Sequence, residues 1–337
     1  MRYSPDVLKI DTDEVVRTIA EAIRRQVREV LRRRGAVLGV SGGVDSAVCA
    51  ALCVLALGKE NVLALFMPER ESSGDSIQLG KLVVNRLEIR SIVEDITPIL
   101  DGARCYSRRG EAIRSAFPEY GEGWKCKISI PSFVDAKRLN ILRLTVQSPD
   151  GEQKTARLSL PSYLQLIAGT NMKQRTRKSI EYYHADRLNY AVCGTPNRLE
   201  YDQGFFVKNG DGAADFKPIA HLYKTQVYAL ANALGIPGEL VTRTPTTDTY
   251  SLEQTQEEFY FAVPYDTMDL CLHGYNHGVA ASEVGPAIGL ATEQVERIYR
   301  DIESKRRSTR YLHYPPLLVE EVKEIHREIA GDPEFVK

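Results

Sequence analysis

The sequence predicts a doubly wound α/β fold, in which helices cover both faces of a parallel β-sheet. The chain has 337 residues, of which 43% are hydrophobic, so it can bury a large core. A short apolar stretch at 36–40 leads through a glycine-rich turn into an alanine-rich helix that ends near Leu57, and a second apolar stretch follows at 61–67. A strand, a helix and a strand in this order are joined by a right-handed crossover, which makes the two strands parallel.

Each further element is predicted from its own pattern. Before the first strand, residues 11–34 carry an apolar side chain at every fourth position from Val15 to Leu31, which places one apolar stripe along a helix. A helix at 222–234 is stopped by the glycine and the proline that follow it. The other predicted elements are a helix at 76–87, a strand at 91–96, a helix at 178–188 and a strand at 190–193.

The pattern changes over residues 104–165, where prolines and alternating apolar residues replace helical periodicity. We interpret this stretch as an insertion within a single domain that spans residues 1–337. Two alternating segments, 141–146 and 156–160, flank the sequence Ser-Pro-Asp-Gly. This arrangement predicts a β-hairpin that turns at 149–151.

Composition excludes several classes of protein. Lysine and arginine total 44, and aspartate and glutamate total 45, so the net charge of -1 provides no field that would hold a nucleic acid. The longest apolar run, 48–57, is much shorter than the roughly 20 residues of a membrane-spanning helix. The N-terminus has no apolar signal-peptide core, and the six cysteines contain no Cys-x-x-Cys pair. We therefore expect a cytoplasmic protein with reduced thiols that binds neither membrane nor nucleic acid.

The turn after the first strand, Ser41-Gly-Gly-Val-Asp45-Ser46, predicts an anion site. A strand that passes through a glycine turn into a helix presents unpaired backbone N–H groups and the positive end of the helix dipole. Neither GxxxxGK[ST] nor GxGxxG occurs at this turn. A carboxylate in such a loop repels phosphates unless a cation lies between them, so Asp45 is a candidate Mg²⁺ ligand. The alternative is that Asp45 only caps the helix.

Ser41–Ser46 matches the SGGxDS signature of the ATP pyrophosphatases, and later motifs make the resemblance more specific. In that class the loop holds the β- and γ-phosphates as a leaving group, so attack falls on the α-phosphorus. Over about residues 19–101 and 169–316, the sequence resembles the ammonia-dependent NAD synthetases. The motifs that carry the resemblance are NMKQRTR at 171–177, GTPNRLE at 194–200, GFFVKNGDGAAD at 204–215, PIAHLYK at 218–224 and PTTD at 245–248.

The resemblance implies a homodimer whose dinucleotide site lies near the subunit interface. It also implies a reaction in which ATP adenylates the nicotinate carboxylate of deamido-NAD, pyrophosphate leaves, and ammonia displaces AMP to form the amide of NAD. We expect free ammonia, from solution or from a separate ammonia-supplying protein. Position 2 is arginine rather than a nucleophilic cysteine, and the segment that holds Cys105 and Cys126 contains no histidine to activate either thiol.

Site residues follow from the resemblance, motif by motif. The catalytic residues implied are Asp45, Lys224 and Asp211. The ATP-binding residues implied are Gly39, Val40, Ser41, Gly42, Gly43, Val44, Asp45, Ser46, Thr195, Lys224 and Thr246. The ligands implied for Mg²⁺ are Asp45 and Glu200. The residues implied to bind deamido-NAD are Arg175, Phe205, Lys208, Asp215, Ser304 and Lys305.

Elementary chemistry supports some of these roles and leaves alternatives open. Lys224 can neutralise the charge that grows on leaving pyrophosphate, and Phe205 offers a face to a pyridine or purine ring. The alternatives are a solvated lysine at a helix start, a core phenylalanine and, for residues 208–215, a surface turn. An adenylated intermediate hydrolyses in open water, so residues 244–258 are expected to form a mobile loop that closes over it.

The chain departs from the family pattern in three places. Compact members lack a segment like 104–165, the loop after Pro-Thr reads Thr-Asp-Thr rather than Ala-Asp-Leu, and Ser304-Lys-Arg stands where many members have His-Lys-Arg. These departures leave the substrate open. The alternatives are an amide ligase of the same mechanism that acts on another carboxylate, such as a sugar acid, a tRNA-modifying ATP pyrophosphatase and a nucleotide-binding relative without activity.

Overall fold

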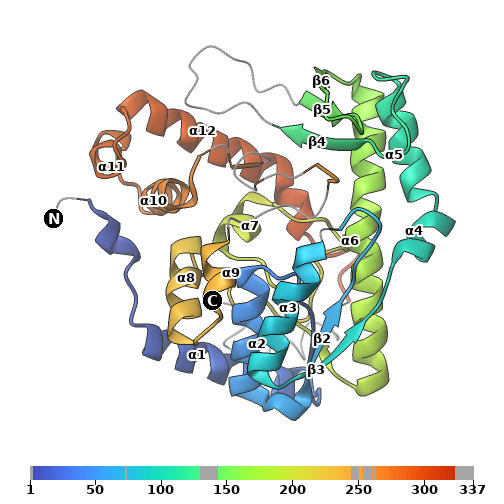
Figure 1. Ribbon diagram of the computed structural model, residues 1–337. Helices are drawn as coiled ribbons and strands as arrows, with labels where there is room; N and C mark the ends of the chain where they lie inside the picture. The colour runs from blue at the N-terminus through green and yellow to red at the C-terminus, as the bar shows by residue number, and fades with distance from the viewer. Residues whose placement is uncertain are drawn as a thin grey trace.

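The computed structural model describes residues 3–72, 74–129, 143–243, 250–252, 255, 260–261 and 263–322. At its centre is a four-stranded sheet in the order β3-β2-β1-β7, in which all neighbours are parallel. The strands are β1 (Ala36–Gly39), β2 (Val62–Phe66), β3 (Arg90–Val93) and β7 (Ala191–Val192). Helices cover both faces of this sheet (Figure 1), which confirms the predicted doubly wound α/β class.

The strands are apolar on both sides because both faces of the sheet are covered. Successive strand residues point to opposite faces, and Ala36 and Leu38 belong to the larger core, while Val37 packs on the other side with Leu63 and Ala185. The helices of the larger core are α1 (Thr12–Arg25), α2 (Val44–Leu57), α3 (Gly74–Leu87) and α8 (Lys224–Ala233). Alpha-helical geometry ends at Arg25, and the π-helical turn η2 (Gln26–Val30) completes the first predicted helix.

The strand order reverses at β1, because β2 and β3 lie on one side of it and β7 on the other. In doubly wound sheets, ligands bind in the crevice outside the carboxyl ends of the strands at such a switch point. The segments that follow β1 and β7 therefore flank the expected binding crevice. These segments carry the SGGxDS turn and the GTPNRLE motif.

A second, antiparallel sheet of three strands stands at one end of the molecule (Figure 1). Its strands are β4 (Lys125–Ser129), β5 (Arg143–Gln147) and β6 (Gln153–Ala156). β5 and β6 pair as a hairpin across the residues 149–151, as the sequence predicts, but β6 ends at Ala156, where the second alternating segment was expected to begin. Together with α5 (Cys105–Arg114), this sheet forms a small core that contains Ile128 and Leu166. We call α5 and β4–β6 the β-module.

The long helix α6 (Leu160–Leu188) crosses the molecule from the β-module to the central sheet (Figure 1). It begins well before Lys178, where the sequence predicted a helix start, so the predicted insertion ends inside a helix. Ser159 caps it by accepting a hydrogen bond from the Ser162 N–H, and Asn189 ends it in the left-handed conformation. Its 29 residues span about 43 Å at 1.5 Å per residue.

The C-terminal helices build a third part of the molecule against the crevice. They are α7 (Arg198–Gln203), α10 (Tyr265–Asn276), α11 (Ala281–Ile288) and α12 (Thr292–Thr309). These helices share one core with Leu8 near the N-terminus. The shorter elements are η1 (Pro5–Leu8), η3 (Lys59–Asn61), α4 (Thr97–Gly102), α9 (Gly238–Thr242) and η5 (Arg310–His313). Among the described residues, none of the helices combines the length and the apolar character needed to cross a membrane.

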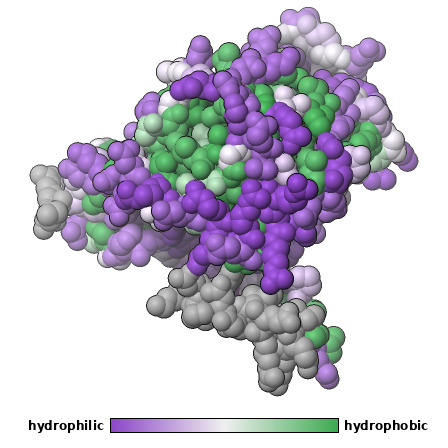
Figure 2. All heavy atoms as spheres, turned by 90° about the horizontal axis from the view of Figure 1, so that it is seen from below, coloured by the Kyte–Doolittle hydropathy of each residue, from purple (hydrophilic) through white to green (hydrophobic). Residues whose placement is uncertain are grey.

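Apolar side chains gather in one area of the face seen from below, where hydrophilic side chains border them (Figure 2). Elsewhere on the surface, the first turns of α6 expose Leu160 and Leu164, with 68% and 55% of their surface accessible. All six cysteines are free thiols and buried.

Candidate functional site

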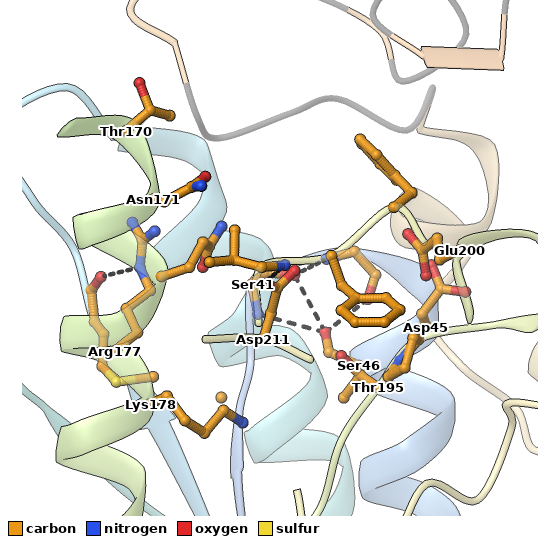
Figure 3. A pocket seen from close by; sticks show the side chains of 18 of the residues that line it. Ser41, Asp45, Ser46, Thr170, Asn171, Arg177, Lys178, Thr195, Glu200 and Asp211 are labelled. Atoms are coloured by element: carbon orange, nitrogen blue, oxygen red, sulfur yellow. Dashed lines mark hydrogen bonds between the residues drawn. The ribbon is translucent and has the colours of Figure 1, made fainter. Parts of the chain in front are cut away.

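A cavity of about 580 Å³ opens at the carboxyl ends of β1 and β7, where the strand order reverses. Its walls come from the SGGxDS turn, the segment after β2, helix α6, the segments after β7 and the start of α8. Figure 3 shows Asp45 and Glu200 beside each other on one side of the cavity and Arg177 and Lys178 from α6 on the other. Residues that are far apart in the sequence therefore meet at one site.

The glycine turn has the geometry that an anion loop needs. Gly42 has φ +77°, and a Cβ there would stand 2.6 Å from the Ser76 carbonyl oxygen, so only glycine fits. The Ser46 hydroxyl donates to the Gly43 carbonyl at 2.9 Å and closes the turn. Gly43 is the N-cap of α2 and has no side chain that could satisfy the first N–H groups of the helix. Unpaired N–H groups at the start of a helix are the kind of group that binds anions in such loops.

Asp45 lies in the first turn of α2, and partners from two other elements hold its carboxylate. One oxygen pairs with the Lys224 ammonium, and the other accepts a hydrogen bond from the Asn197 side-chain amide at 3.1 Å. Gly43, not Asp45, occupies the N-cap position, so the capping alternative does not describe this carboxylate. Asp45 is thus a bridge between the loop, the segment after β7 and α8.

Lys224 is fully buried, which excludes the alternative of a solvated lysine at a helix start. Burial lowers the pKa of a lysine, but Asp45 and Glu200 outweigh that effect and hold the pKa of Lys224 above its ordinary value. The ammonium therefore stays charged. Its helix start is fixed by Asp269 of α10, whose carboxylate accepts from the Lys224 N–H at 3.2 Å and the Thr225 N–H at 2.7 Å.

Glu200 is oriented by a capping box at the start of α7. Asn197 accepts from the N–H groups of Leu199 and Glu200, and the Glu200 carboxylate accepts from the Asn197 N–H at 3.0 Å. Burial and the neighbouring charge of Asp45 raise the pKa of Glu200 to about 8. Two carboxylates held together in this way favour a cation between them.

The donor set fits Mg²⁺ bound jointly by protein and phosphates. Mg²⁺ keeps several non-protein ligands and is commonly held by one or two carboxylates plus substrate phosphate oxygens. The cavity offers Asp45 and Glu200 next to an anion loop. Over the part of the chain that the structure describes, no group of three or more histidine, cysteine, aspartate or glutamate side chains is placed to form an all-protein metal cage.

Basic side chains from α6 and the segment after α7 form the opposite wall. Arg177 donates from Nε to the Met67 carbonyl at 3.2 Å, and Arg175 donates to the Lys208 carbonyl at 3.2 Å. The Lys208 ammonium donates to the carbonyls of Tyr311 and Tyr314 at 2.8 and 3.0 Å. Lys208 thereby fastens the C-terminal segment at the rim of the cavity.

Aromatic rings line one end of the cavity. Phe205 stacks on Tyr260 with ring centroids 4.6 Å apart, and Phe261 meets Phe205 edge-on at 5.5 Å. Phe205 and Tyr260 both line the cavity, so Phe205 is not solely a core residue. This end can accept the face of a planar ring.

The structure brings together most of the residues that the sequence assigned to the site. Those that line the cavity are Gly39, Val40, Ser41, Gly43, Val44, Asp45, Ser46, Arg175, Thr195, Glu200, Phe205, Lys208, Asp211 and Lys224. Gly42 shapes the loop from behind the wall. Thr246 and most of the predicted loop at 244–258 lie outside the described residues.

Three assigned residues stand outside the cavity wall. The Asp215 carboxylate accepts from the Val192 N–H at 2.7 Å and the Tyr182 hydroxyl at 3.3 Å, so it fastens β7. Lys305 donates to the Tyr260 carbonyl at 2.7 Å and therefore supports the ring that stacks on Phe205. Ser304 is exposed on α12. Resemblance placed these residues in the site, but their contacts in the structure are with the protein around it.

The cavity also holds residues to which the sequence assigned no role. Lys178 and Glu181 of α6 both line it and form a buried ion pair of 2.6 Å. The sequence shows that these two residues are three positions apart and so lie on one face of a helix. Nothing in the sequence shows that α6 packs beside β1. Asn197 stood within the quoted GTPNRLE motif, where an asparagine three residues before a glutamate is a capping signal.

A parallel sheet with an anion loop at its switch point and a paired aspartate and lysine in the cavity defines an α/β protein of the adenine-nucleotide α-hydrolase class. The model of the family NAD synthase matches residues 15–113 and 138–311. The chain belongs to this family.

Relatives agree with the assignment to the family, and a solved structure agrees with the fold. The chain is 58% identical to an NH(3)-dependent NAD(+) synthetase of Rhizobium meliloti over 96% of either chain. It is 36% identical to one of Thermotoga maritima, over 80% of this chain and 88% of the relative. The fold is similar to that of an NH3-dependent NAD synthetase from Campylobacter jejuni, with a TM-score of 0.60 and 22% identity over 92% of this chain and 100% of that chain.

Proposed function

We propose that this protein makes NAD by ATP-dependent amidation of deamido-NAD with ammonia. The observation that carries the proposal is the bridge formed by Asp45, Lys224 and Asn197 at an anion loop, in a chain 58% identical to an NH(3)-dependent NAD(+) synthetase. An oxygen of the nicotinate carboxylate attacks the α-phosphorus of ATP and pyrophosphate leaves. Ammonia then attacks the acyl carbon, and AMP leaves with the former carboxylate oxygen.

ATP is bound by the loop and the adjoining charges. The N–H groups at the start of α2 hold the β- and γ-phosphates, and Ser41 and Ser46 set the shape of the turn. Lys224, charged and buried, neutralises the negative charge that develops on the leaving pyrophosphate. Thr195 contributes to the same wall.

Asp45 and Glu200 are the residues that would hold Mg²⁺ at this site. When bound, the ion would supply positive charge that offsets the negative charge of the phosphates and carboxylates. The residues of the chain then keep ATP oriented, because Asn197 and Lys224 hold Asp45 from two sides.

Deamido-NAD enters from the basic and aromatic end of the cavity. Arg175 and Lys208 supply positive charge for its pyrophosphate, and Phe205 on Tyr260 supplies a stacking face for a ring. Asp211 accepts from the Val207 N–H at 2.8 Å and projects into the cavity, where it can take a proton from the attacking ammonia. Lys305 supports this end from behind through the Tyr260 carbonyl, and Asp215 fastens β7.

The experiment is an activity assay with the purified protein, ATP, Mg²⁺, ammonium and deamido-NAD. Equal amounts of AMP and NAD should form, and omission of deamido-NAD should stop pyrophosphate release. A comparison with nicotinic acid mononucleotide and a sugar acid tests the choice of carboxylate. Release of AMP with one of those compounds but not with deamido-NAD would overturn the proposal.

We propose in addition that two copies of the chain associate as a homodimer. The support is the surface of α6, where Leu160 and Leu164 stand four residues apart and are largely exposed. An interface between two copies would remove both side chains from water. Light scattering on a size-exclusion column measures the mass, which should be twice 37.8 kDa and should fall toward 37.8 kDa in Leu164→Glu. A wild-type mass of one chain would contradict the proposal.

A further inference from the structure

A network of buried charges lies behind the cavity and has no part in the proposed chemistry. Lys173 of α6 pairs with Glu69 and with Glu71, both at 2.8 Å, and Arg109 of α5 pairs with Glu71 at 2.7 Å. The side chains of Lys173 and Glu69 are 1% and 0% exposed. Two positive and two negative charges thus meet where three segments of the chain converge.

Glu69 organises the turn that follows β2. One carboxylate oxygen accepts from Lys173, and the other accepts from the Tyr106 hydroxyl at 2.6 Å and from the Glu71 N–H at 3.1 Å. The turn is closed by the Ser72 N–H, which donates to the Glu69 carbonyl at 2.9 Å. The side chain of Glu69 therefore fixes both the shape of the turn and its distance from α6.

Glu71 joins the β-module to the same turn. Burial raises the pKa of a carboxyl group, yet Arg109 and Lys173 outweigh that effect and hold the pKa of Glu71 below its ordinary value. The Arg109 side chain is also packed against Gly169 of α6, where a Cβ would stand 2.7 Å from its Cγ. Ion pairs between these charged side chains therefore hold helix α5, helix α6 and the turn together.

The turn that this network holds is a wall of the cavity beside the anion loop. Met67, Pro68 and Ser72 line the cavity, and α3, which follows the turn, packs so close to the anion loop that a Cβ on Gly42 would stand 2.6 Å from the Ser76 carbonyl oxygen. On the other side of the network, α6 presents Arg177, which donates to the Met67 carbonyl. A shift of the turn relative to α6 would move the nucleotide side of the cavity, while the aromatic end at Phe205 would stay in place.

We propose that Glu69 and Lys173 are positioning residues that set the affinity for ATP by fixing the turn at 67–72 against α6. Neither side chain lines the cavity, so they act through Met67, Pro68 and Ser72. The inference rests on the proposed use of ATP at this site. A misplacement of about 1 Å in a wall that holds a substrate can cost roughly a hundredfold in rate, so a tenfold loss of affinity is a moderate expectation.

Equilibrium binding of a non-hydrolysable ATP analogue tests the proposal in Glu69→Gln. We expect the dissociation constant to rise about tenfold, the KM for ATP to rise similarly, and kcat and the KM for deamido-NAD to change by less than about twofold. The matched control is Asp101→Asn, because Asp101 of α4 pairs with Arg70 of the same turn, but both side chains are half exposed. The control should bind the analogue as the wild type does.

The double variant Glu69→Gln with Lys173→Met distinguishes an effect on the position of the turn from an effect on the stability of the protein. It removes both charges, so no charge of this pair is left buried alone, and its melting temperature should exceed that of Glu69→Gln. Its affinity for the analogue should nevertheless stay low, because the bonds between turn and helix are still missing. Wild-type affinity in a folded Glu69→Gln protein, or affinity that returns together with melting temperature in the double variant, would overturn the proposal. If the Glu69→Gln protein does not fold, the affinity of the double variant for the analogue tests the proposal: a low affinity supports it, and wild-type affinity overturns it.

Binding of the analogue needs no deamido-NAD, so it tests the positioning role of Glu69 and Lys173 separately from the choice of carboxylate substrate. If the wild type binds the analogue but makes no NAD, the proposed substrate is wrong while the positioning role is still tested. If the wild type makes NAD and the variants bind normally, only the positioning role fails.

Discussion

At the scale of single residues, the site depends on one carboxylate. Asp45 is the group through which the anion loop, the segment after β7 and α8 contact one another. Its partner Lys224 is buried and charged, so removal of the Asp45 charge leaves a buried ammonium without its ion-pair partner, and only the charge of Glu200 still compensates it. Such a loss is more costly than the loss of an exposed ion pair.

Asp45→Asn and Glu200→Gln should therefore each lower the rate of adenylation at least about a hundredfold. The amide keeps the volume of the side chain but removes a hard ligand of Mg²⁺. Pyrophosphate release at increasing Mg²⁺ concentration measures the effect, and circular dichroism shows whether the fold is retained. Asp101→Asn, on an exposed pair, is the control. Near-normal turnover of both variants at limiting Mg²⁺ would contradict the metal assignment.

Asp269 gives a second prediction at this scale, on stability as a function of pH. Burial raises its pKa to about 6, whereas an unfolded aspartate titrates near 3.8. The folded state therefore binds more protons between these values, and the free energy of unfolding falls as pH rises from about 4 to about 6. The loss amounts to roughly 3 kcal/mol, since one pKa unit corresponds to about 1.4 kcal/mol.

The side chain in Asp269→Asn cannot ionise, so the free energy of unfolding of this variant should not fall in this way. Urea unfolding of both proteins at pH 4, 5, 6 and 7 measures it. The stability of the variant relative to the wild type should improve as pH rises over this range. This is expected even though the two hydrogen bonds that fix the start of α8 then lack a charged acceptor. Parallel curves for the two proteins would show that Asp269 does not titrate as described.

At the scale of elements, local patterns predicted the central sheet well. The strand at 36–40, the turn and α2 are each defined by neighbours in sequence, and the structure has all three where they were expected. Helix α6 was predicted too short because Gly169 and β-branched Thr170 lower helix propensity in its first half. The structure explains that glycine, since α5 packs so closely that a Cβ would meet Arg109.

Long-range contacts could not be predicted in the same way. Glu69 and Lys173 are 104 residues apart, and no periodicity indicates that they meet. Lys305 was assigned to the substrate from a motif alone, but the direction of its side chain, toward the Tyr260 carbonyl, depends on how α12 packs. Sequence motifs thus predicted residues of which most line the cavity, and tertiary packing decides which of them face it.

The glycine turn allows a prediction at the scale of the element. Gly42→Ala should destabilise the protein by about 1–3 kcal/mol, because φ is +77° and the Cβ would press on a backbone carbonyl. Gly43→Ala should change stability by less than about 0.5 kcal/mol, since its φ is -93° and its Cβ would meet only the Ser41 hydroxyl at 3.3 Å. Thermal unfolding compares the two. An equal effect of both substitutions would mean that the turn tolerates a side chain at Gly42.

At the scale of the whole molecule, three parts that each have a hydrophobic core of their own form the cavity together. The central sheet supplies the anion loop, the C-terminal helices supply Phe205 with its supporting rings, and the β-module supplies Ile128. Ile128 lies in residues 114–137, which the family model does not match. The β-module is therefore part of the wall of the cavity.

The burial of every cysteine predicts which nitrogen donor this chain uses. Hydrolysis of glutamine by a cysteine nucleophile requires a reactive thiolate that the substrate can reach. All six thiols are buried, and burial raises the pKa of Cys105 and Cys193 and brings that of Cys271 to about 12. We expect ammonium to support NAD formation and glutamine at the same concentration to support less than about a hundredth of that rate. Parallel assays that follow NAD and glutamate measure this.

Because contaminating ammonium imitates a weak glutamine activity, each glutamine sample is compared with and without an enzyme that removes ammonium. Sustained NAD formation with one glutamate per NAD in the treated sample would show that the chain has a glutaminase site. Its absence would leave dissolved ammonia, or ammonia released by a separate protein, as the source.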